Sequence, residues 1–228
     1  MAVQLTWLGH ATWKLQLDKY QILIDPFLTE NPSAKVSAES LAADFIFITH
    51  GHVDHIGDAA PIALRTGATV VCNYEISVWL SEKHGVKNTQ GMNLGGWIKL
   101  PFGRALHTIA FHSSQLPDGA YGGNPGGYLI EAGGKKLYFA GDTALFSDMR
   151  LIGDYGIDAA ILPIGDFYTM GPDDSLRAIK FLQPKVALPS HFNTWPPIEQ
   201  DAAAWAARVS SETGAQPLTP AVGETVTL

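Results

Sequence analysis

The segment THGHVDHIGD, residues 49 to 58, carries three histidines and two aspartates in ten positions. His50 and His52 are two residues apart and can face the same way in an extended turn, whereas Asp54 and His55 follow where the chain bends. Neutral imidazole and carboxylate groups suit zinc, manganese or ferrous iron. Because four donors this close together would crowd a single ion, the spacing predicts that the bend divides them between two metal ions.

Other metal-capable side chains stand at the ends of apolar, strand-like runs. The runs DFIFIT, LHTIAF, KLYFAG and VALPS are followed directly by His50, His112, Asp142 and His191. In open α/β sheets, ligands bind in the crevice outside the strand ends, where loops from several strands meet. We therefore expect these four side chains to reach one pocket.

The pattern of elements that must position these residues is that of an α/β protein. Strands are expected first, at 3 to 8, 12 to 17 and 21 to 24, and strands and helices alternate after residue 44. Helices are expected at 58 to 66, 74 to 84, 144 to 154, 172 to 182 and 199 to 213, and the tail ETVTL is expected to form a closing strand. No linker or repeat interrupts the chain, so we expect a single domain over residues 1 to 228.

Composition narrows the class of protein. The net charge is −7 and there is no basic run, which disfavours a nucleic-acid substrate. The apolar stretches have only strand length, so no membrane span is expected, and the N-terminus lacks the pattern of a signal peptide. A single cysteine, Cys72, fits a reducing compartment, and we expect a cytoplasmic protein.

The motif His50-x-His52-x-Asp54-His55 resembles the signature of the metallo-β-lactamase superfamily. The wider pattern is similar to the UPF0173-type metal-dependent hydrolases, relatives of the ascorbate-6-phosphate lactonase family. The segments that carry this resemblance run from residue 7 to 197: WLGHAT, ILIDPF, THGHVDHIGD, AFHSS, GDTALFSDM, LPIGDFYTMGP and SHFNTWP. The resemblance implies a four-layer αββα sandwich, in which two mixed β-sheets lie between helices and the metals lie at one edge.

The resemblance also implies a ligand set. The family pattern assigns His50, His52 and His112 to one metal, assigns Asp54, His55 and His191 to the other, and makes Asp142 the bridge between them. Asp25, in ILIDPF, matches an aspartate that orients ligands from behind, although an aspartate before a proline can also cap a turn.

The implied activity is hydrolysis by a metal-bridging hydroxide, with a small ester, lactone or phosphodiester as substrate. Two divalent metal ions are expected, zinc first, with manganese or iron as alternatives. The expected catalytic residues are Asp142, which would hold both ions, and His10, which would contact the substrate or protonate the leaving group; a metal-bound water could supply the same proton, and His10 could be structural. The partner is expected to be a small anionic or ester-like molecule rather than a nucleic acid or a membrane, and a homo-oligomer is compatible with the sequence.

Other functions fit the same motif, because one fold supports many reactions. A nuclease of the superfamily is disfavoured by the acidic charge, and a diiron redox enzyme would need a flavin domain. A non-catalytic metal-binding module would keep the ligands without turnover.

Two loops are expected near the metals. GGNPGG, residues 122 to 127, lacks the lysine and the hydroxyl residue of a phosphate loop. In GDFYTMGP, Phe167 and Tyr168 stand where related sequences often have Asn and Phe, a departure that concerns the pocket rather than the metals, and Asp166 is either an orienting group or a turn residue. His84 and His107 are expected to be structural.

Overall fold

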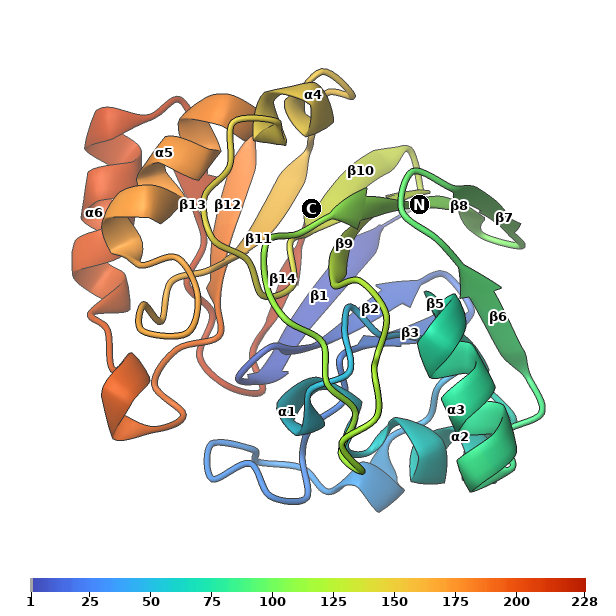
Figure 1. Cartoon of the computed structure of the whole chain (residues 1–228). Helices are drawn as coiled ribbons and strands as arrows, with labels where there is room; N and C mark the ends of the chain where they lie inside the picture. The colour runs from blue at the N-terminus through green and yellow to red at the C-terminus, as the bar shows by residue number, and fades with distance from the viewer. Residues whose placement is uncertain (1) are drawn as a thin grey trace.

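Two seven-stranded β-sheets pack face to face between two groups of helices (Figure 1). The structure is a computed structural model that describes residues 2–228. The four layers confirm the expected αββα sandwich of the α/β class. Each sheet combines antiparallel and parallel strands, so both sheets are mixed.

The first sheet is built from the N-terminal half of the chain and the C-terminal strand. Its order is β14-β1-β2-β3-β4-β5-β6. The bounds are β1 (Val3–Gly9), β2 (Thr12–Leu17), β3 (Tyr20–Ile24), β4 (Phe45–Phe47), β5 (Thr69–Asn73), β6 (Thr89–Met92) and β14 (Thr225–Thr227). The strands from β14 to β3 are antiparallel and those from β3 to β6 are parallel.

The second sheet repeats this plan with the following strands, in the order β13-β12-β11-β10-β9-β8-β7. The bounds are β7 (Trp97–Leu100), β8 (Gly103–Ile109), β9 (Gly126–Ala132), β10 (Lys135–Phe139), β11 (Ala159–Pro163), β12 (Val186–Ser190) and β13 (Gln216–Pro217). Strands β7 to β10 are antiparallel, and β10 to β13 are parallel. In the first sheet, β1 and the strands from β3 to β6 therefore run in one direction and end at one edge. In the second sheet, the same holds for β8 and the strands from β10 to β13.

Helices cover the outer faces of both sheets (Figure 1). The helical segments are η1 (Ala38–Ser40), α1 (Val53–Ile56), α2 (Ala59–Thr66), α3 (Tyr74–His84), α4 (Met149–Gly153), α5 (Pro172–Leu182), η2 (Pro196–Ile198) and α6 (Ala202–Glu212). Helices α2 and α3 pack on the first sheet, and α4 to α6 pack on the second. Within residues 2–228, no helix is both long and apolar enough to cross a membrane.

Local sequence explains where these helices begin. Helix α5 has Pro172 in its first turn, followed by two aspartates that interact favourably with the helix dipole. Helix α6 is capped at its N-terminus by Asp201, whose carboxylate accepts hydrogen bonds from two backbone N–H groups at 2.9 Å. The expected elements therefore agree closely with the observed ones, including the closing strand β14.

One expected helix is shorter than its sequence pattern. The expectation of a helix from 144 to 154 is wrong for the first five residues, since α4 begins at Met149. The N–H of Ala144 donates to the carbonyl of Phe111 at 3.1 Å, and the N–H of Phe111 donates to the hydroxyl of Thr143 at 3.0 Å. This pairing with a distant loop holds residues 143 and 144 out of the helix.

Candidate metal centre

The seven expected metal ligands converge at the edge where the strands end. They arrive from the loop after β4, the short helix α1, and the loops after β8, β10 and β12. The donor atoms of His50, His52 and His112 lie within 4.8 Å of one another. A second group, with the same spacing, contains Asp54, His55 and His191, and His10 joins it.

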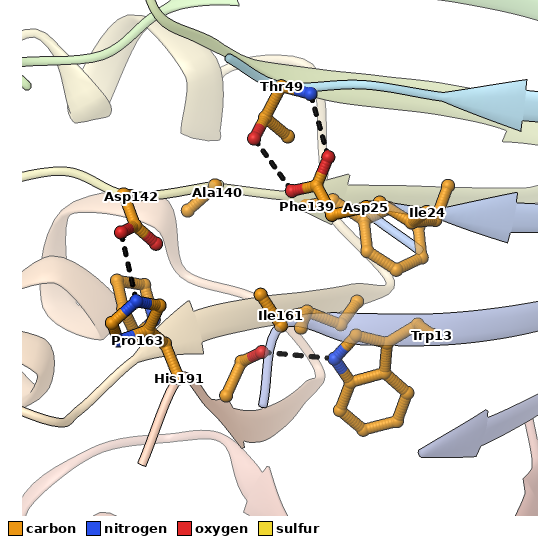
Figure 2. A pocket seen from close by; sticks show the side chains of 13 residues that line it. Trp13, Ile24, Asp25, Thr49, Phe139, Ala140, Asp142, Ile161, Pro163 and His191 are labelled. Carbon is orange, nitrogen blue, oxygen red and sulfur yellow. Dashed lines mark hydrogen bonds and ion pairs between the residues drawn. The ribbon is translucent and has the colours of Figure 1, made fainter. Parts of the chain in front are cut away.

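Asp142 lies between these two groups. One of its oxygens, Oδ2, is 3.0 Å from Nε2 of His191 and 3.6 Å from Nε2 of His112. The other, Oδ1, is 3.4 Å from Nε2 of His55. Figure 2 shows Asp142 and His191 pointing toward one another. One carboxylate thus contacts histidines of both groups, which is the position that a shared ligand requires.

The divided arrangement has a local cause in the backbone. His50 and His52 stand on an extended segment, and helix α1 begins directly after His52, whose carbonyl accepts the N–H of His55 at 3.0 Å. This helical turn places Asp54 and His55 beside His191, while the ring of His55 stays next to that of His50, with centroids 4.1 Å apart. A single stretch of six residues therefore supplies donors to both groups.

Asp25 lies behind the ligands, directly after β3, and is 1% exposed. Its carboxylate accepts hydrogen bonds from the N–H of Thr49 at 2.8 Å, from the Thr49 hydroxyl at 2.6 Å and from Nδ1 of His55 at 2.8 Å; the two bonds from Thr49 are drawn in Figure 2. Because the Thr49 hydroxyl donates to Asp25, it accepts from Nδ1 of His50 at 3.0 Å. These bonds place the protons of both rings on Nδ1 and leave Nε2 free to bind a metal.

Ser114 also supports the site, and the sequence analysis did not single it out. Its hydroxyl accepts the N–H of Gly51, between His50 and His52, at 3.0 Å and donates to the carbonyl of Gly122 at 2.9 Å. Asn73 donates to the same carbonyl at 2.6 Å. The glycine-rich loop is therefore pinned beside the metal-binding segment, and the only signal for Ser114 in the sequence is its place two residues after His112.

His10 is fully buried, and both of its ring nitrogens have partners. Nε2 lies 3.0 Å from the carboxylate of Asp54, and Nδ1 lies 2.8 Å from the hydroxyl of Thr194. Its carbonyl accepts hydrogen bonds from Nε1 of Trp7 at 2.9 Å and from the N–H of His191 at 3.0 Å, which ties the ends of β1 and β12 together. Both ring nitrogens of His10 therefore contact side chains of the protein itself.

The charges of the site suit divalent cations. Burial by itself raises the pKa of Asp142, but His191 and His55 lower it well below its usual value. Burial lowers the pKa of His191, yet Asp142 and Asp54 outweigh this effect and raise it to about 9. The pKa of His55 is raised in the same way, by Asp142 and Asp25 against the effect of burial. Positive charge is thus required among these carboxylates, and either protons or metal ions can supply it.

Several buried polar atoms of the proposed ligands have no hydrogen-bond partner among the described residues. Within residues 2–228, Nε2 of His55, both ring nitrogens of His191 and Oδ1 of Asp142 have no partner in hydrogen-bond geometry. Unpaired buried nitrogen and oxygen atoms are costly, and metal coordination would satisfy them. The residues therefore fit a metal centre.

The ligands are accessible from a cleft of about 610 Å³. Its lining consists of Phe27, Glu30, His52, Val53, Asp54, His112, Ser113, Asp142, Tyr168, His191 and Trp195. A much smaller cavity, of about 20 Å³, lies between the sheets behind Asp142 (Figure 2) and has room for about one water molecule. The cleft is thus the route by which a substrate would reach the metals.

The remaining candidates lie outside the ligand groups. Asp166 is a turn residue whose carboxylate accepts the N–H of Phe167 at 2.9 Å. His84 packs on Trp79 at the end of α3, with ring centroids 4.2 Å apart. His107 is buried in β8 and stacks on Tyr128, with centroids 4.9 Å apart.

A family model and several known proteins match most of this chain. The family model described as "Beta-lactamase superfamily domain" matches residues 20–192. A UPF0173 metal-dependent hydrolase of Thermus thermophilus is 50% identical over 206 residues, which cover 90% of this chain and 91% of that protein. A UPF0173 metal-dependent hydrolase of Symbiobacterium thermophilum is 46% identical over 230 residues, covering 99% and 100% of the two chains.

A solved structure is similar over its whole length. It is that of a metallo hydrolase from the archaeon Ignicoccus hospitalis, with a TM-score of 0.91 and 40% sequence identity. The match covers 100% of this chain and 99% of the archaeal one.

Proposed function

The chain belongs to the beta-lactamase superfamily, among the UPF0173 metal-dependent hydrolases, and from this we propose that it hydrolyses a small ester, lactone or phosphodiester at a centre of two divalent metal ions. Zinc is the first expected metal, with manganese or iron as alternatives. The observation that carries the proposal is the position of Asp142, whose carboxylate contacts histidine nitrogens of both groups.

The proposed ligands divide as the two groups do. His50, His52 and His112 would hold one ion, and Asp54, His55 and His191 would hold the other. Asp142 would be shared between them. Two ions facing only two carboxylate ligands retain positive charge, which attracts the electron-rich centre of an ester or phosphoryl group.

When bound, the two cations would lower the pKa of water toward neutrality and stabilise the negative charge that develops on the substrate. The chain itself orients the ligands. Asp25 and Thr49 fix the rings of His50 and His55, and we propose that His10 holds the Asp54 carboxylate in place. A substrate in the cleft would meet the five proposed ligands that line it, which are His52, Asp54, His112, Asp142 and His191.

The rival functions are separated by metal analysis and a substrate panel. We expect the purified chain, loaded with zinc or manganese and desalted, to retain close to two ions per molecule. It should hydrolyse at least one activated ester, lactone, thioester or phosphodiester, lose this activity with a chelator, and regain it with the metal. Retention of one ion in metal excess would refute the two-metal centre, and two retained ions without turnover on the whole panel would favour a metal-binding module.

A further inference from the structure

The charge of the cleft lining restricts the substrate. Apart from the proposed ligands, Glu30 is the only charged residue among the eleven that line the cleft, and none of these described residues is lysine or arginine. Phosphate and carboxylate groups are normally recognised by such cations, often through paired hydrogen bonds. Here an anionic group away from the reacting bond would find no cationic side chain and would be repelled by Glu30.

Four of the eleven residues that line the cleft are apolar or aromatic. Phe27, Trp195, Tyr168 and Val53 contribute to the lining. The rings of Phe27 and Trp195 are neighbours, with centroids 6.1 Å apart. Val53 is 51% exposed although it stands between two proposed ligands. Contact with an apolar part of a substrate would bury these side chains, and this burial would favour binding.

A strained turn beside the cleft contacts one of its lining residues, Tyr168. Asp166 and Phe167 both have left-handed backbone angles, with φ of 62° and 54°. Phe167 is 73% exposed, and its ring packs edge-on against that of Tyr168, with centroids 4.7 Å apart. A bulky residue in this conformation is a genuine outlier, and its exposed ring gains little burial in return. Backbone strain of this kind clusters at active sites and ligand-binding segments.

We infer that the cleft selects an uncharged ester, lactone or thioester with an apolar chain, which lies against Phe27, Trp195 and Tyr168, while Phe167 positions the Tyr168 ring and Glu30 disfavours anions. This inference rests on the proposed hydrolase function and narrows its substrate class. It assigns substrate selection to residues that bind no metal.

The first test compares p-nitrophenyl acetate with p-nitrophenyl hexanoate, using the full zinc- or manganese-loaded protein. A fully buried methylene group is worth roughly fourfold in binding, so the four added groups, even partly buried, should raise kcat/KM by about tenfold or more. Bis(p-nitrophenyl) phosphate, an anion with the same leaving group, is intrinsically less reactive than the two esters, so only a preference of the protein for it is informative. Equal rates on acetate and hexanoate, or a preference for the phosphodiester, would overturn the inference.

The second test uses variants of Tyr168, which lines the cleft, and of Phe167, which packs against it. Phe167→Asn places a residue that tolerates the left-handed conformation at this turn, so Tm should rise by about 2 to 4 °C. The hexanoate-to-acetate ratio of kcat/KM should nevertheless fall several-fold, and Tyr168→Ala should lower it further. A change in Tm without a change in this ratio would make the turn merely structural and overturn the assignment of Phe167.

Two further variants complete the comparison. Glu30→Gln keeps the size of the side chain and removes its charge, so the phosphodiester-to-acetate ratio should rise several-fold; an unchanged ratio would remove Glu30 from the inference. Tyr74→Ala is the control, because Tyr74 is an exposed aromatic residue outside the cleft lining, and it should leave both ratios unchanged. If the metal-loaded protein hydrolyses none of the esters, the proposed function itself fails, which differs from hydrolysis without chain-length preference.

Discussion

Replacing Asp25 by asparagine removes one negative charge from behind the metal site while keeping the size of the side chain. Asp25 accepts three hydrogen bonds, two from Thr49 and one from Nδ1 of His55. In Asp25→Asn, an NH₂ group replaces one of the two carboxylate oxygens. This group cannot accept a hydrogen bond, so at least one of the three donors loses its acceptor. If the NH₂ group faces His55, Nδ1 must accept and the proton moves to Nε2, the atom proposed to bind metal.

The size of this effect follows from the contacts. Substituting a group that orients a metal ligand typically costs 10- to 100-fold in metal affinity. This corresponds to about 1.4 to 2.7 kcal/mol of binding free energy. Each hydrogen bond to a charged group also contributes about 1.5 to 3 kcal/mol to stability, so the metal-free variant should unfold more easily. Because His55 belongs to the group with Asp54 and His191, one of the two ions should be weakened more than the other.

The assay is competition for zinc between the protein and a chromophoric chelator, together with the metal content after desalting. Asp44→Asn provides a matched control, since Asp44 accepts a backbone hydrogen bond from Gln21 at 2.8 Å and lies outside the ligand groups. Folding of both variants is checked by circular dichroism. Wild-type affinity for both ions in a folded Asp25→Asn protein would refute the reasoning.

The other predictions concern the bridge, His10, proton release and a buried histidine. Asp142→Ala should lose activity and at least one ion while the fold persists; two retained ions with full turnover would exclude a bridging role. His10→Ala should keep all proposed ligands but weaken one ion by about 10- to 100-fold, since Asp54 loses its partner; wild-type metal affinity, measured by chelator competition, would contradict this. Metal loading in weak buffer should release protons, because the pKa of His191 is raised to about 9 by Asp142 and Asp54 despite its burial, and no release at pH 7 would argue against its ligand role. Burial lowers the pKa of His107 from 6.5 to about 4, so between these pH values His107 is protonated in the unfolded chain but neutral in the folded protein. The free energy of unfolding should therefore fall by up to about 3 kcal/mol as the pH falls from 6.5 to 4. Urea unfolding of His107→Phe should show a smaller dependence of this free energy on pH in the same range.

Local patterns along the chain were sufficient to predict most of the elements. The runs at 3 to 8, 12 to 17 and 21 to 24 form β1, β2 and β3, and the helix expected at 172 to 182 is α5. Strand and helix periods, caps and turn residues act over a few neighbours, so they can be read without knowing the fold. The motif from His50 to His55 was informative for the same reason, since its donors are close in sequence. The αββα sandwich and the metal-dependent hydrolase family, inferred from these motifs, are confirmed.

Contacts between distant segments required the tertiary structure. The pairing of His10 with Asp54 joins residues 44 positions apart, and that of Ser114 with Gly51 joins residues 63 apart. The shortened helix α4 and the exposed Phe167 are likewise set by contacts or backbone angles that no local pattern specifies. Such pairings depend on how the two sheets stack and where their strands end, and packing of the whole chain decides this. The sequence therefore determined which residues can bind metal, and the fold determined which of them face one another and what kind of cleft leads to them.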